Sequence, residues 1–507
     1  MKRSLSLLLA LLLVISSLTL LSCANTPDAP SEAPVTPSTP DDTPDEPKEP
    51  ANERIPLELP DLYYGGDTPV HILQWTVGNE VEAGTGWVPW EEGDVEEYSD
   101  DMMQAAVFAR NAWVEEQLGV KITAEYARVE GDVFQNRMYQ DFSTTANEIQ
   151  LATLRARTIM PVVEAGLYYD MNEFAGEILH TDQPWWPQDA VASYALGDSM
   201  FVCASEMLLR DKGATEAVFF NTKQANDHGM TMLYDYVGIG DWTVELMIDA
   251  CTVVATSLDG DGLINSAEDI WGLEGQSKPY MLFVGGGYKF AHIDDDGYIA
   301  YDFGSKETIL AMQDIYEDVI YADWNYTGIK PVKNCPENGL FSVDKVLFSG
   351  TQVKAGLVQY GNMETEYGIL PVPKLEYGQD SYHSWVSCHG DSTVGIPAGV
   401  TDPEMCAMAL EMLSYEGYYS VKPLLYENLL LYRMAKSEES KRSVEIVFDT
   451  RTYDPGQYWD DEYALQGTIF HLSKSGNSNI AGIWSSWERT TMGQIDKMND
   501  FIDSTKK

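Results

Sequence analysis

A run of acidic and amide residues in the middle of the chain has the spacing of a calcium-binding loop. With residue 257 as position one, oxygen-bearing groups fall at positions one, three, five, seven, nine and twelve, and they belong to Ser257, Asp259, Asp261, Leu263 (through its carbonyl), Asn265 and Glu268. Gly262 stands at position six, where such loops turn sharply. The spacing predicts calcium binding, and the alternative is a hydrated acidic turn without metal.

The residues after this loop limit what calcium would do. Residues 270–275 (IWGLEG) have the pattern of a strand and not of a second helix. Calcium sensors work by reorienting two helices. In a loop followed by a strand, calcium is therefore expected only to stabilise the local structure of the chain. Three carboxylates and a serine predict weak binding, with a dissociation constant in the roughly 10⁻⁴–10⁻³ M range of extracellular modules.

Aromatic residues are the second group with chemical meaning. The chain contains 13 Trp and 29 Tyr. A site for neutral sugars needs flat apolar rings against the C–H faces of the sugar and planar polar groups for its hydroxyls. Trp75 and Trp385 stand at the end of an expected strand or just after one, and Trp484 and Trp487 share one face of an expected helix. The alternative for each ring is packing in the core.

Sequence signatures of catalysis are sparse. The chain has no Gly-x-Ser-x-Gly elbow, no His-Glu-x-x-His motif and no Gly-x-x-x-x-Gly-Lys phosphate loop. No two of the seven histidines stand at metal-ligand spacing. A glycosidase needs only two well-placed carboxylates, so that class stays open. The sequence favours a binding protein that is not an enzyme and requires no cofactor.

These residues must be positioned by alternating strands and helices. Residues 70–75 (VHILQW) form an apolar strand, and residues 101–119 follow as a helix with an apolar face and a terminal glycine. Residues 120–127 are the next strand. A later helix has Asp402 as N-cap and Pro403 at its first position. Alternation of this kind predicts an α/β fold with largely parallel sheets.

Four segments between residues 220 and 413 carry a resemblance to a known family. They are FNTKQA (220–225), GDWTVELM (240–247), YGILPVP (367–373) and GIPAGVTDPEMCAMALEML (395–413). Their types and order resemble the extracellular solute-binding proteins of ABC importers, the family that includes maltose-binding protein. The resemblance covers most of the chain from Pro69 onward. The chain is longer than is typical of the family, and residues 77–98 have no counterpart in it.

The resemblance implies two α/β lobes joined by hinge-crossing strands, with the ligand cleft between the lobes. It assigns residues 69–203 and 374–425 to lobe 1 and residues 209–365 and 435–507 to lobe 2. The chain would cross between the lobes near residues 203–206, 367–373 and 425–435. The resemblance also implies ligand contacts, and the residues at the matching positions are Glu206, Gln276, Tyr280, Tyr360, Trp484 and Trp487. For Glu206, a salt bridge or a helix cap is the alternative.

The first residues predict export and anchoring. Lys2 and Arg3 precede an apolar run over residues 5–21, as in a secretory signal of residues 1–22. Residues 20–23 (LLSC) resemble the bacterial lipobox, which implies cleavage before Cys23 and lipidation of its thiol; an ordinary signal peptide is the alternative. Eight prolines and no apolar period follow in residues 24–50, so residues 23–60 are expected to form an extended tether.

Charge argues against some classes of ligand, and the cysteine positions limit the possible disulfides. A formal net charge of −48 argues against nucleic acid as a ligand, because nucleic-acid binding needs a basic surface. Beyond the signal, no apolar run is long enough to cross a bilayer. Cys251 and Cys406 stand among apolar helix positions and are expected to be buried. The sequence is compatible with one disulfide among Cys203, Cys335 and Cys388 but does not choose a pair.

Together these features predict a lipid-anchored, monomeric receptor at the extracellular face of the cell membrane. It would capture a sugar or oligosaccharide in an aromatic-lined cleft and deliver it to the permease subunits of an ABC importer. A surface glycan-binding lipoprotein without a transporter and a secreted glycosidase are the alternatives. Peptide-binding relatives share the architecture, so a peptide ligand also stays open.

Overall fold

The computed structural model describes ten stretches of the 507-residue chain: 54–76, 101–275, 278–327, 332, 335, 339–431, 437–459, 467–469, 472 and 476–506. The predicted signal peptide, Cys23 and most of the predicted tether lie outside the described residues. The chain divides into two units, Met1–Ile55 and Pro56–Lys507, and the fold described below belongs to the second.

The first sheet contains four strands in the order β12-β3-β1-β2. Strands β1 (Thr68–Thr76), β2 (Val120–Arg128) and β3 (Leu151–Arg155) run parallel, and β12 (Ser392–Gly395) pairs antiparallel with β3. The strands of this sheet contribute apolar side chains to the first hydrophobic core of the unit, and the outer strand β2 alternates buried and exposed residues. The predicted strand at residues 70–75 is therefore confirmed as the inner part of β1.

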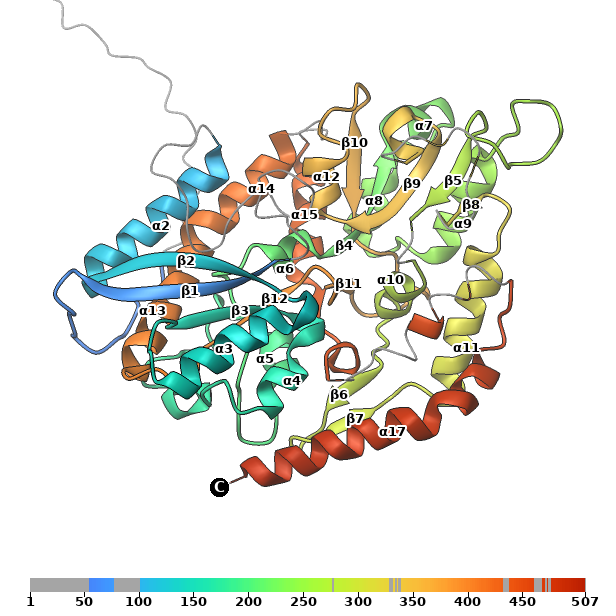
Figure 1. Cartoon of the computed structure of the whole chain (residues 1–507). Helices are drawn as coiled ribbons and strands as arrows, with labels where there is room; N and C mark the ends of the chain where they lie inside the picture. The colour runs from blue at the N-terminus through green and yellow to red at the C-terminus, as the bar shows by residue number, and fades with distance from the viewer. Residues whose placement is uncertain are drawn as a thin grey trace, which may run out of the picture. The chain divides into compact units, whose positions relative to one another are not determined.

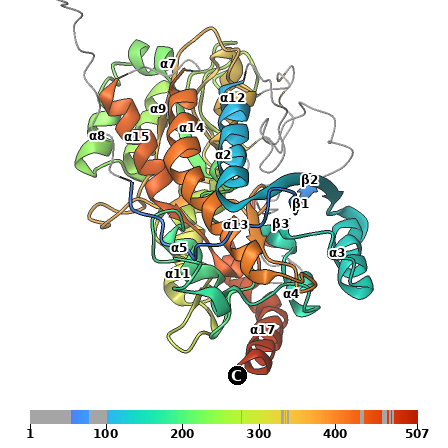
Figure 2. The same cartoon turned by 90° about the vertical axis from the view of Figure 1, so that its left-hand side faces the viewer.

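Helices surround this sheet. They are α2 (Met102–Leu118), α3 (Val133–Thr144), α4 (Met160–Glu164), α5 (Gln188–Tyr194) and α13 (Pro403–Glu416). The Asp101 side chain caps α2 by accepting from the backbone N–H of Met103 at 2.8 Å, and Gly119 ends the helix at φ 72°. Asp402 caps α13 in the same way, so both predicted helix boundaries are confirmed. Figure 2 shows α2 lying alongside α13 and α14 (Lys422–Leu431).

The second sheet contains five strands in the order β10-β4-β9-β5-β8. Their bounds are Glu216–Asn221 for β4, Trp271–Glu274 for β5, Asn325–Tyr326 for β8, Val346–Gln352 for β9 and Tyr367–Leu370 for β10. Strand β4 runs antiparallel to both of its neighbours, whereas β5 is parallel to β8 and β9. Alternate residues of β4 enter two different cores, with Val218 in the second core and Phe219 in the third.

The helices around the second sheet follow the same sequence logic. They are α7 (Thr222–Asp227), α8 (Leu233–Ile239), α9 (Val244–Val254), α10 (Lys278–Gly285), α11 (Lys306–Asp314), α12 (Lys354–Val358) and α15 (Glu438–Asp449). Helix α9 begins at Thr243, whose hydroxyl accepts from the backbone of Leu246. This is the helix predicted from the segment GDWTVELM, and its apolar face packs on β5.

Short segments connect the two sheets. Strand β11 (Ser384–Trp385) pairs in parallel with β13 (Arg451–Thr452), and Val386 bridges to Thr215 next to β4. The short helix α6 (Arg210–Gly213) precedes β4. Residues 422–431 form α14, which covers the first half of the third crossing predicted near residues 425–435, and residues 432–436 lie outside the described residues. This crossing stays a prediction.

The last helix packs against two cores. Helix α17 (Ile480–Thr505) places Ile480 in the second core and Ile495 and Ile502 in the first. Figure 1 shows it running beside the hairpin of β6 (Ala291–Ile293) and β7 (Ile299–Tyr301). An ion pair between Lys497 and Glu164 at 3.0 Å adds a link to α4.

The described cysteines carry no disulfide. Cys203, Cys251, Cys335, Cys388 and Cys406 are free thiols, so none of the pairings left open by the sequence is present. Cys251 and Cys406 are fully buried, as predicted. No helix within the described part of the chain has the length and apolar character needed to cross a membrane.

Candidate ligand-binding site

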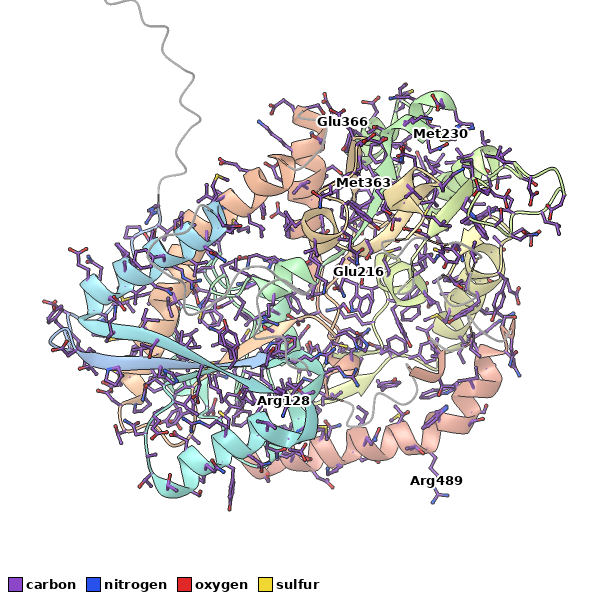
Figure 3. All side chains as sticks on the ribbon, turned by 45° about the horizontal axis from the view of Figure 1, so that its top comes forward. Arg128, Glu216, Met230, Met363, Glu366 and Arg489 are labelled. Carbon is purple, nitrogen blue, oxygen red and sulfur yellow. The ribbon has the colours of Figure 1, made fainter. Side chains whose placement is uncertain are left out.

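The parallel strands of the first sheet end together at one edge. Trp75 and Thr76 end β1, Arg128 ends β2 (labelled in Figure 3) and Arg155 ends β3. The chain passes from β1 to β2 on one side of β1 and then crosses to β3 on the other side. In open α/β sheets such a change of direction places a ligand crevice outside the carboxyl ends of the strands. This edge is therefore a candidate for ligand contact.

Trp75 is the predicted site residue that lies at this edge. Its indole N–H donates to the hydroxyl of Ser392 at 2.6 Å, which fixes the plane of the ring. The guanidinium groups of Arg210 and Arg155 lie 4.6 and 5.6 Å from the ring centre. Cations over an indole face are attracted by its quadrupole. The side chain is 1% exposed, so in this conformation the two arginines and Ser392 occupy the surroundings of the ring.

Two arginines at this edge also contact the neighbouring His389 and help to lower its pKa. The Nε–H of Arg155 donates to the carbonyl of His389 at 2.7 Å, and Nη1 of Arg157 lies 3.0 Å from the His389 Nδ1. Burial, with repulsion from Arg157 and Arg155, lowers the pKa of His389 to about 3. The imidazole is therefore neutral at physiological pH, and the positive charge at this edge resides on the arginines.

The second sheet also gathers polar groups where its parallel strands end. Glu274 ends β5 and accepts from the backbone N–H of Leu340 at 2.8 Å. Burial raises the pKa of Glu274 to about 7, although backbone donors and Lys278 act in the opposite direction. Burial likewise lowers the pKa of Lys278 to about 7, and its ammonium group donates to the carbonyl of Tyr326 at 2.9 Å. Both groups thus change charge near neutral pH.

Tyr360 belongs to the same network. Its hydroxyl lies 2.8 Å from the hydroxyl of Ser349, which itself donates to Glu274 at 3.4 Å. The ring packs against Phe341 and Phe219 at centroid distances of 4.6 and 5.3 Å. The structure places Tyr360 within the third core, where its ring has almost no surface facing solvent. A ligand contact by this ring stays a prediction.

Tyr280 and Trp385 lie together at the crossing between the sheets. Their ring centres are 5.7 Å apart, and Tyr280 is also 5.7 Å from Phe290. Both predicted residues are buried, and they come from α10 and β11, which meet at this point. Figure 3 labels Glu216, which opens β4, the strand that β11 approaches. The structure therefore brings two of the predicted aromatic residues side by side.

Glu206 is enclosed by cations. Its carboxylate lies 2.8 Å from Lys212, 2.6 Å from Arg451 and 3.6 Å from Lys422, and Arg451 also pairs with Asp211 at 2.7 Å. Burial would raise the pKa of Glu206, but attraction to Arg451, Lys212 and Lys422 outweighs it and lowers the pKa. The salt-bridge alternative describes this geometry, and ligand binding by Glu206 stays a prediction.

The remaining predicted residues lie apart. Trp484 is half-buried on α17 and stacks on Tyr301 with ring centres 5.8 Å apart and planes 11° apart. Trp487, one turn later, is half-buried and packs against the second core. Gln276 lies outside the described residues. Ring contacts connect Trp484 to Tyr280 and Trp385 through Phe303, which lies 5.9 Å from Trp484, and Phe290, which lies 4.8 Å from Phe303. No described ring contact joins Trp75 at the β1 edge to this group.

The predicted calcium loop is held by its own hydrogen bonds. Asp261 accepts from the backbone N–H of Leu263 at 2.7 Å and from the Asn265 amide at 3.1 Å, and the Ser257 hydroxyl donates to Asp259 at 3.2 Å. Asp269, one residue beyond the loop, accepts from the backbone of Leu258, Asn265 and Ser266. Among the described residues no three His, Cys, Asp or Glu side chains are arranged to hold a metal ion. Calcium binding stays a prediction.

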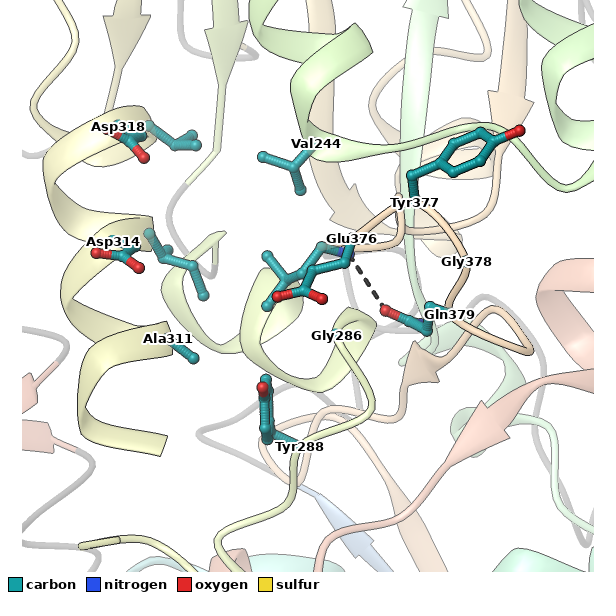
Figure 4. A pocket seen from close by; sticks show the side chains of 13 residues that line it. Val244, Gly286, Tyr288, Ala311, Asp314, Asp318, Glu376, Tyr377, Gly378 and Gln379 are labelled. Atoms are coloured by element: carbon teal, nitrogen blue, oxygen red, sulfur yellow. Dashed lines mark hydrogen bonds between the residues drawn. The ribbon is translucent and has the colours of Figure 1, made fainter. Parts of the chain in front are cut away.

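Three cavities among the described residues lie elsewhere. A cavity of about 490 Å³ opens between α9, α10, α11 and the loop that follows β10 (Figure 4). Asp314 and Asp318 point into it from one side, Glu376 stands opposite them, and Tyr288 and Tyr377 flank it. Partial burial and repulsion from Asp318 raise the pKa of Asp314. None of the seven predicted ligand residues that the structure describes lines this cavity or the two smaller ones, of about 260 and 210 Å³.

Several residues of the site were not predicted. Arg155 ends the apolar strand β3, and Arg157 follows two residues later, in the segment LRAR (154–157). Charged residues at the carboxyl end of a parallel strand are a usable signal, because such ends converge on one edge. Arg451 and Arg210 gave no comparable signal, since each depends on contacts across more than 130 residues of sequence.

Comparison with known proteins identifies the fold. No protein-family model and no curated protein sequence matches the chain. Among solved structures, an ABC substrate-binding protein from Listeria monocytogenes in complex with cycloalternan matches with TM-score 0.50 and 12% identity, over 86% of this chain and 99% of that one. The galacto-N-biose/lacto-N-biose I-binding protein of Bifidobacterium longum matches with TM-score 0.50 and 13% identity, over 86% and 98%.

A third structure agrees with these two. The cyclic α-maltosyl-1,6-maltose binding protein of Arthrobacter globiformis matches with TM-score 0.53 and 11% identity, over 85% of this chain and all of that one. Nearly the full length of each solved protein is matched, so the likeness extends over both sheets and the crossing segments. The chain therefore has the two-lobe α/β fold of ABC solute-binding proteins, as the sequence predicted.

Proposed function

We propose that this protein is a receptor that binds a sugar or oligosaccharide between its two lobes and delivers it to an ABC importer. The observation that carries the proposal is the two-lobe fold, which it shares over more than four-fifths of its length with proteins described in complex with sugars or named for them. Fold alone does not fix function. The proposal therefore also depends on the chemistry that the crossing region offers.

That chemistry suits a neutral polyhydroxylated ligand. The rings of Tyr280 and Trp385 meet where the chain passes between the two sheets. Aromatic faces bind the C–H faces of sugars, and planar polar groups bind their hydroxyls. In two-lobe proteins of this kind, closure of the lobes around the ligand is a hinge motion. The mechanism is thus capture and release, with no bond made or broken.

A thermal-shift experiment tests the proposal. Full-length protein is heated alone and with cycloalternan, lacto-N-biose, a broader glycan panel and a peptide panel. Binding to the folded state raises the melting temperature by mass action, and the gain in free energy is about 2.7 kcal/mol at a ligand concentration one hundred times the dissociation constant. We expect at least one glycan to raise the melting temperature. A shift with peptides alone would overturn the ligand class.

Two alternatives give different results. A glycan-binding lipoprotein without a transporter would bind the same sugar but would not become more compact on binding in small-angle X-ray scattering. A glycosidase would release products from a glycan panel, and Glu206→Gln should then abolish turnover. The enclosed position of Glu206 among Arg451, Lys212 and Lys422 favours binding over catalysis, because a carboxylate held charged by three cations does not donate a proton.

Membrane anchoring through Cys23 is part of the proposal. The segment LLSC and the proline-rich stretch after it support a lipidated tether, which would keep the receptor near its permease and raise its effective concentration there. We expect wild-type protein in the membrane fraction of a bacterial expression host and Cys23→Ser protein in the soluble extracellular or periplasmic fraction. Equal membrane association of both proteins would contradict lipidation.

A further inference from the structure

Trp385 differs from the other deeply buried tryptophans of the described chain. Six of those donate their indole N–H to an oxygen at 2.6–3.3 Å, and they are Trp75, Trp185, Trp186, Trp242, Trp271 and Trp459. The Nε1 of Trp385 has no acceptor, although the side chain is only 1% exposed. A buried donor without a partner lowers stability, and native proteins rarely retain one without a reason.

Gln457 has the same property in a stronger form. Neither Oε1 nor Nε2 of its buried amide has a hydrogen-bond partner. The residue ends the 3₁₀-helix η7 (Pro455–Gln457), whose cap Asp454 accepts from the backbone N–H of Gly456 at 3.0 Å and of Phe290 at 2.9 Å. The backbone beneath the amide is therefore fixed. Rearrangement of η7 would break these bonds, so an outside partner is the simpler way to satisfy the amide.

Gln150 provides an internal comparison. It is buried to the same degree, but its Oε1 accepts from the backbone N–H of His71 at 2.9 Å and its Nε2 donates to the carbonyl of Asn147 at 2.8 Å. The amide of Gln150 is thus fully bonded, whereas that of Gln457 is not. Among the described buried glutamines, Gln74 on β1 shares this property with Gln457.

Trp385 and Gly456, the residue before Gln457, flank the same pair of rings. Trp385 lies 5.7 Å from Tyr280, and Tyr280 lies 5.7 Å from Phe290. Phe290 is bonded through its backbone to Asp454, and Gly456, the residue before Gln457, packs against it closely enough that a Cβ would lie 2.6 Å from the Phe290 Cβ. Strand β13, which leads into η7, pairs with Trp385 itself. Both unbonded groups therefore stand where the chain crosses between the lobes.

We propose that the Gln457 amide and the Trp385 indole N–H bind hydroxyl groups of a sugar in the interlobe site. This inference rests on the proposed function and deepens it by naming the groups that read the hydroxyls. An amide supplies one acceptor and two donors in a plane, the indole supplies one donor, and a hydroxyl both donates and accepts. The ligand class is a neutral sugar with free hydroxyls, because an anionic group would find no cation in this pair.

The test compares Gln457→Leu with Gln150→Leu in the full-length protein. Leucine removes the amide and keeps a similar volume. For Gln457→Leu we expect an unchanged or higher melting temperature without sugar, because an unsatisfied buried group disappears. We also expect about tenfold or greater loss of affinity, measured by calorimetry with the glycan that gives the largest shift for the wild type. For Gln150→Leu we expect a lower melting temperature and unchanged affinity. Trp385→Phe should weaken the same glycan as well.

Each other outcome is decisive. If the wild type binds a glycan and Gln457→Leu binds it equally well, the inference is overturned and the proposed function stands; the amide then bonds to internal water. A Gln457→Leu protein that fails to fold also overturns the inference, since that is how a bonded structural amide behaves. If the wild type binds no glycan, the proposed function fails and the inference fails with it.

Discussion

Two buried glutamates of this protein respond to burial in opposite ways. Glu206, at the crossing between the sheets, has its pKa lowered, whereas Glu274, at the end of β5, has its pKa raised to about 7. Desolvation acts on both and raises the pKa of both. The difference lies in the partners. Glu206 contacts three cations within 4 Å, whereas Glu274 accepts hydrogen bonds from neutral donors and has Lys278 as a cationic neighbour, whose attraction does not outweigh burial.

Glu206 therefore forms a permanent electrostatic link between segments, whereas Glu274 changes its protonation state near neutral pH. A buried carboxylate with several cations stays charged across physiological pH and holds the elements that carry those cations. Lys212 stands on α6, Lys422 on α14 and Arg451 on β13, so the charge of Glu206 joins three segments at the crossing. Glu274 has no such enclosure and gains a proton near neutral pH.

The largest expected effect comes from removing Arg451, the central cation of the ion-pair cluster around Glu206. Arg451→Met leaves Glu206 and Asp211 with lysine partners only and takes away two charge-assisted contacts of 2.6 and 2.7 Å. Breaking a buried ion pair by removing one partner costs about 3–5 kcal/mol. We expect a loss of that size in the free energy of unfolding at pH 7, measured by urea denaturation.

A surface pair supplies the control for this variant. Lys441 pairs with Glu438 at 3.1 Å on α15, but both side chains are well exposed. Exposed pairs contribute little because water solvates each partner almost as well. Lys441→Met should therefore leave the unfolding midpoint unchanged. If Arg451→Met lowers the free energy of unfolding no more than Lys441→Met does, the cluster around Glu206 does not stabilise the crossing.

The sequence predicted the framework of this fold better than its site. Helix α2 was bounded correctly because Asp101 and Gly119 act through local backbone geometry. The alternation of strands and helices, together with short motifs between residues 220 and 413, was enough to identify two lobes. The partners of Glu206 could not be predicted, because Arg451 lies more than 240 residues away in sequence and no local pattern indicates the contact.

Aromatic residues show the same limit. Tryptophan type predicts a large apolar face but not whether the indole N–H finds an acceptor. Trp75 and Trp385 looked alike in the sequence, yet the first is bonded to Ser392 and the second has no partner. Gln457 was not predicted because a lone glutamine beside a proline and a glycine has no pattern, and its meaning depends on the packing of Phe290 and Tyr280.

A smaller effect tests the other side of the comparison. Glu274 binds a proton in the folded protein up to a pKa of about 7, whereas the unfolded chain releases it near 4.5. Between these values the folded state holds more protons, so stability falls as pH rises. One pKa unit corresponds to 1.36 kcal/mol, which sets an upper limit of about 3 kcal/mol for the whole loss. Glu274→Gln should remove this fall between pH 5 and pH 7.

The matched control for Glu274→Gln is Glu206→Gln. The folded pKa of Glu206 is lowered, so its contribution is fully present above the unfolded value and does not change between pH 5 and pH 7. Glu206→Gln should therefore lower stability by the same amount at each pH, and Glu274→Gln should change the slope. Denaturation curves at pH 5, 6 and 7 distinguish the two. Parallel pH profiles for wild type and Glu274→Gln would show that the Glu274 carboxylate is already charged in the folded protein, and the contrast between the two glutamates would then fail, because both would be charged at neutral pH.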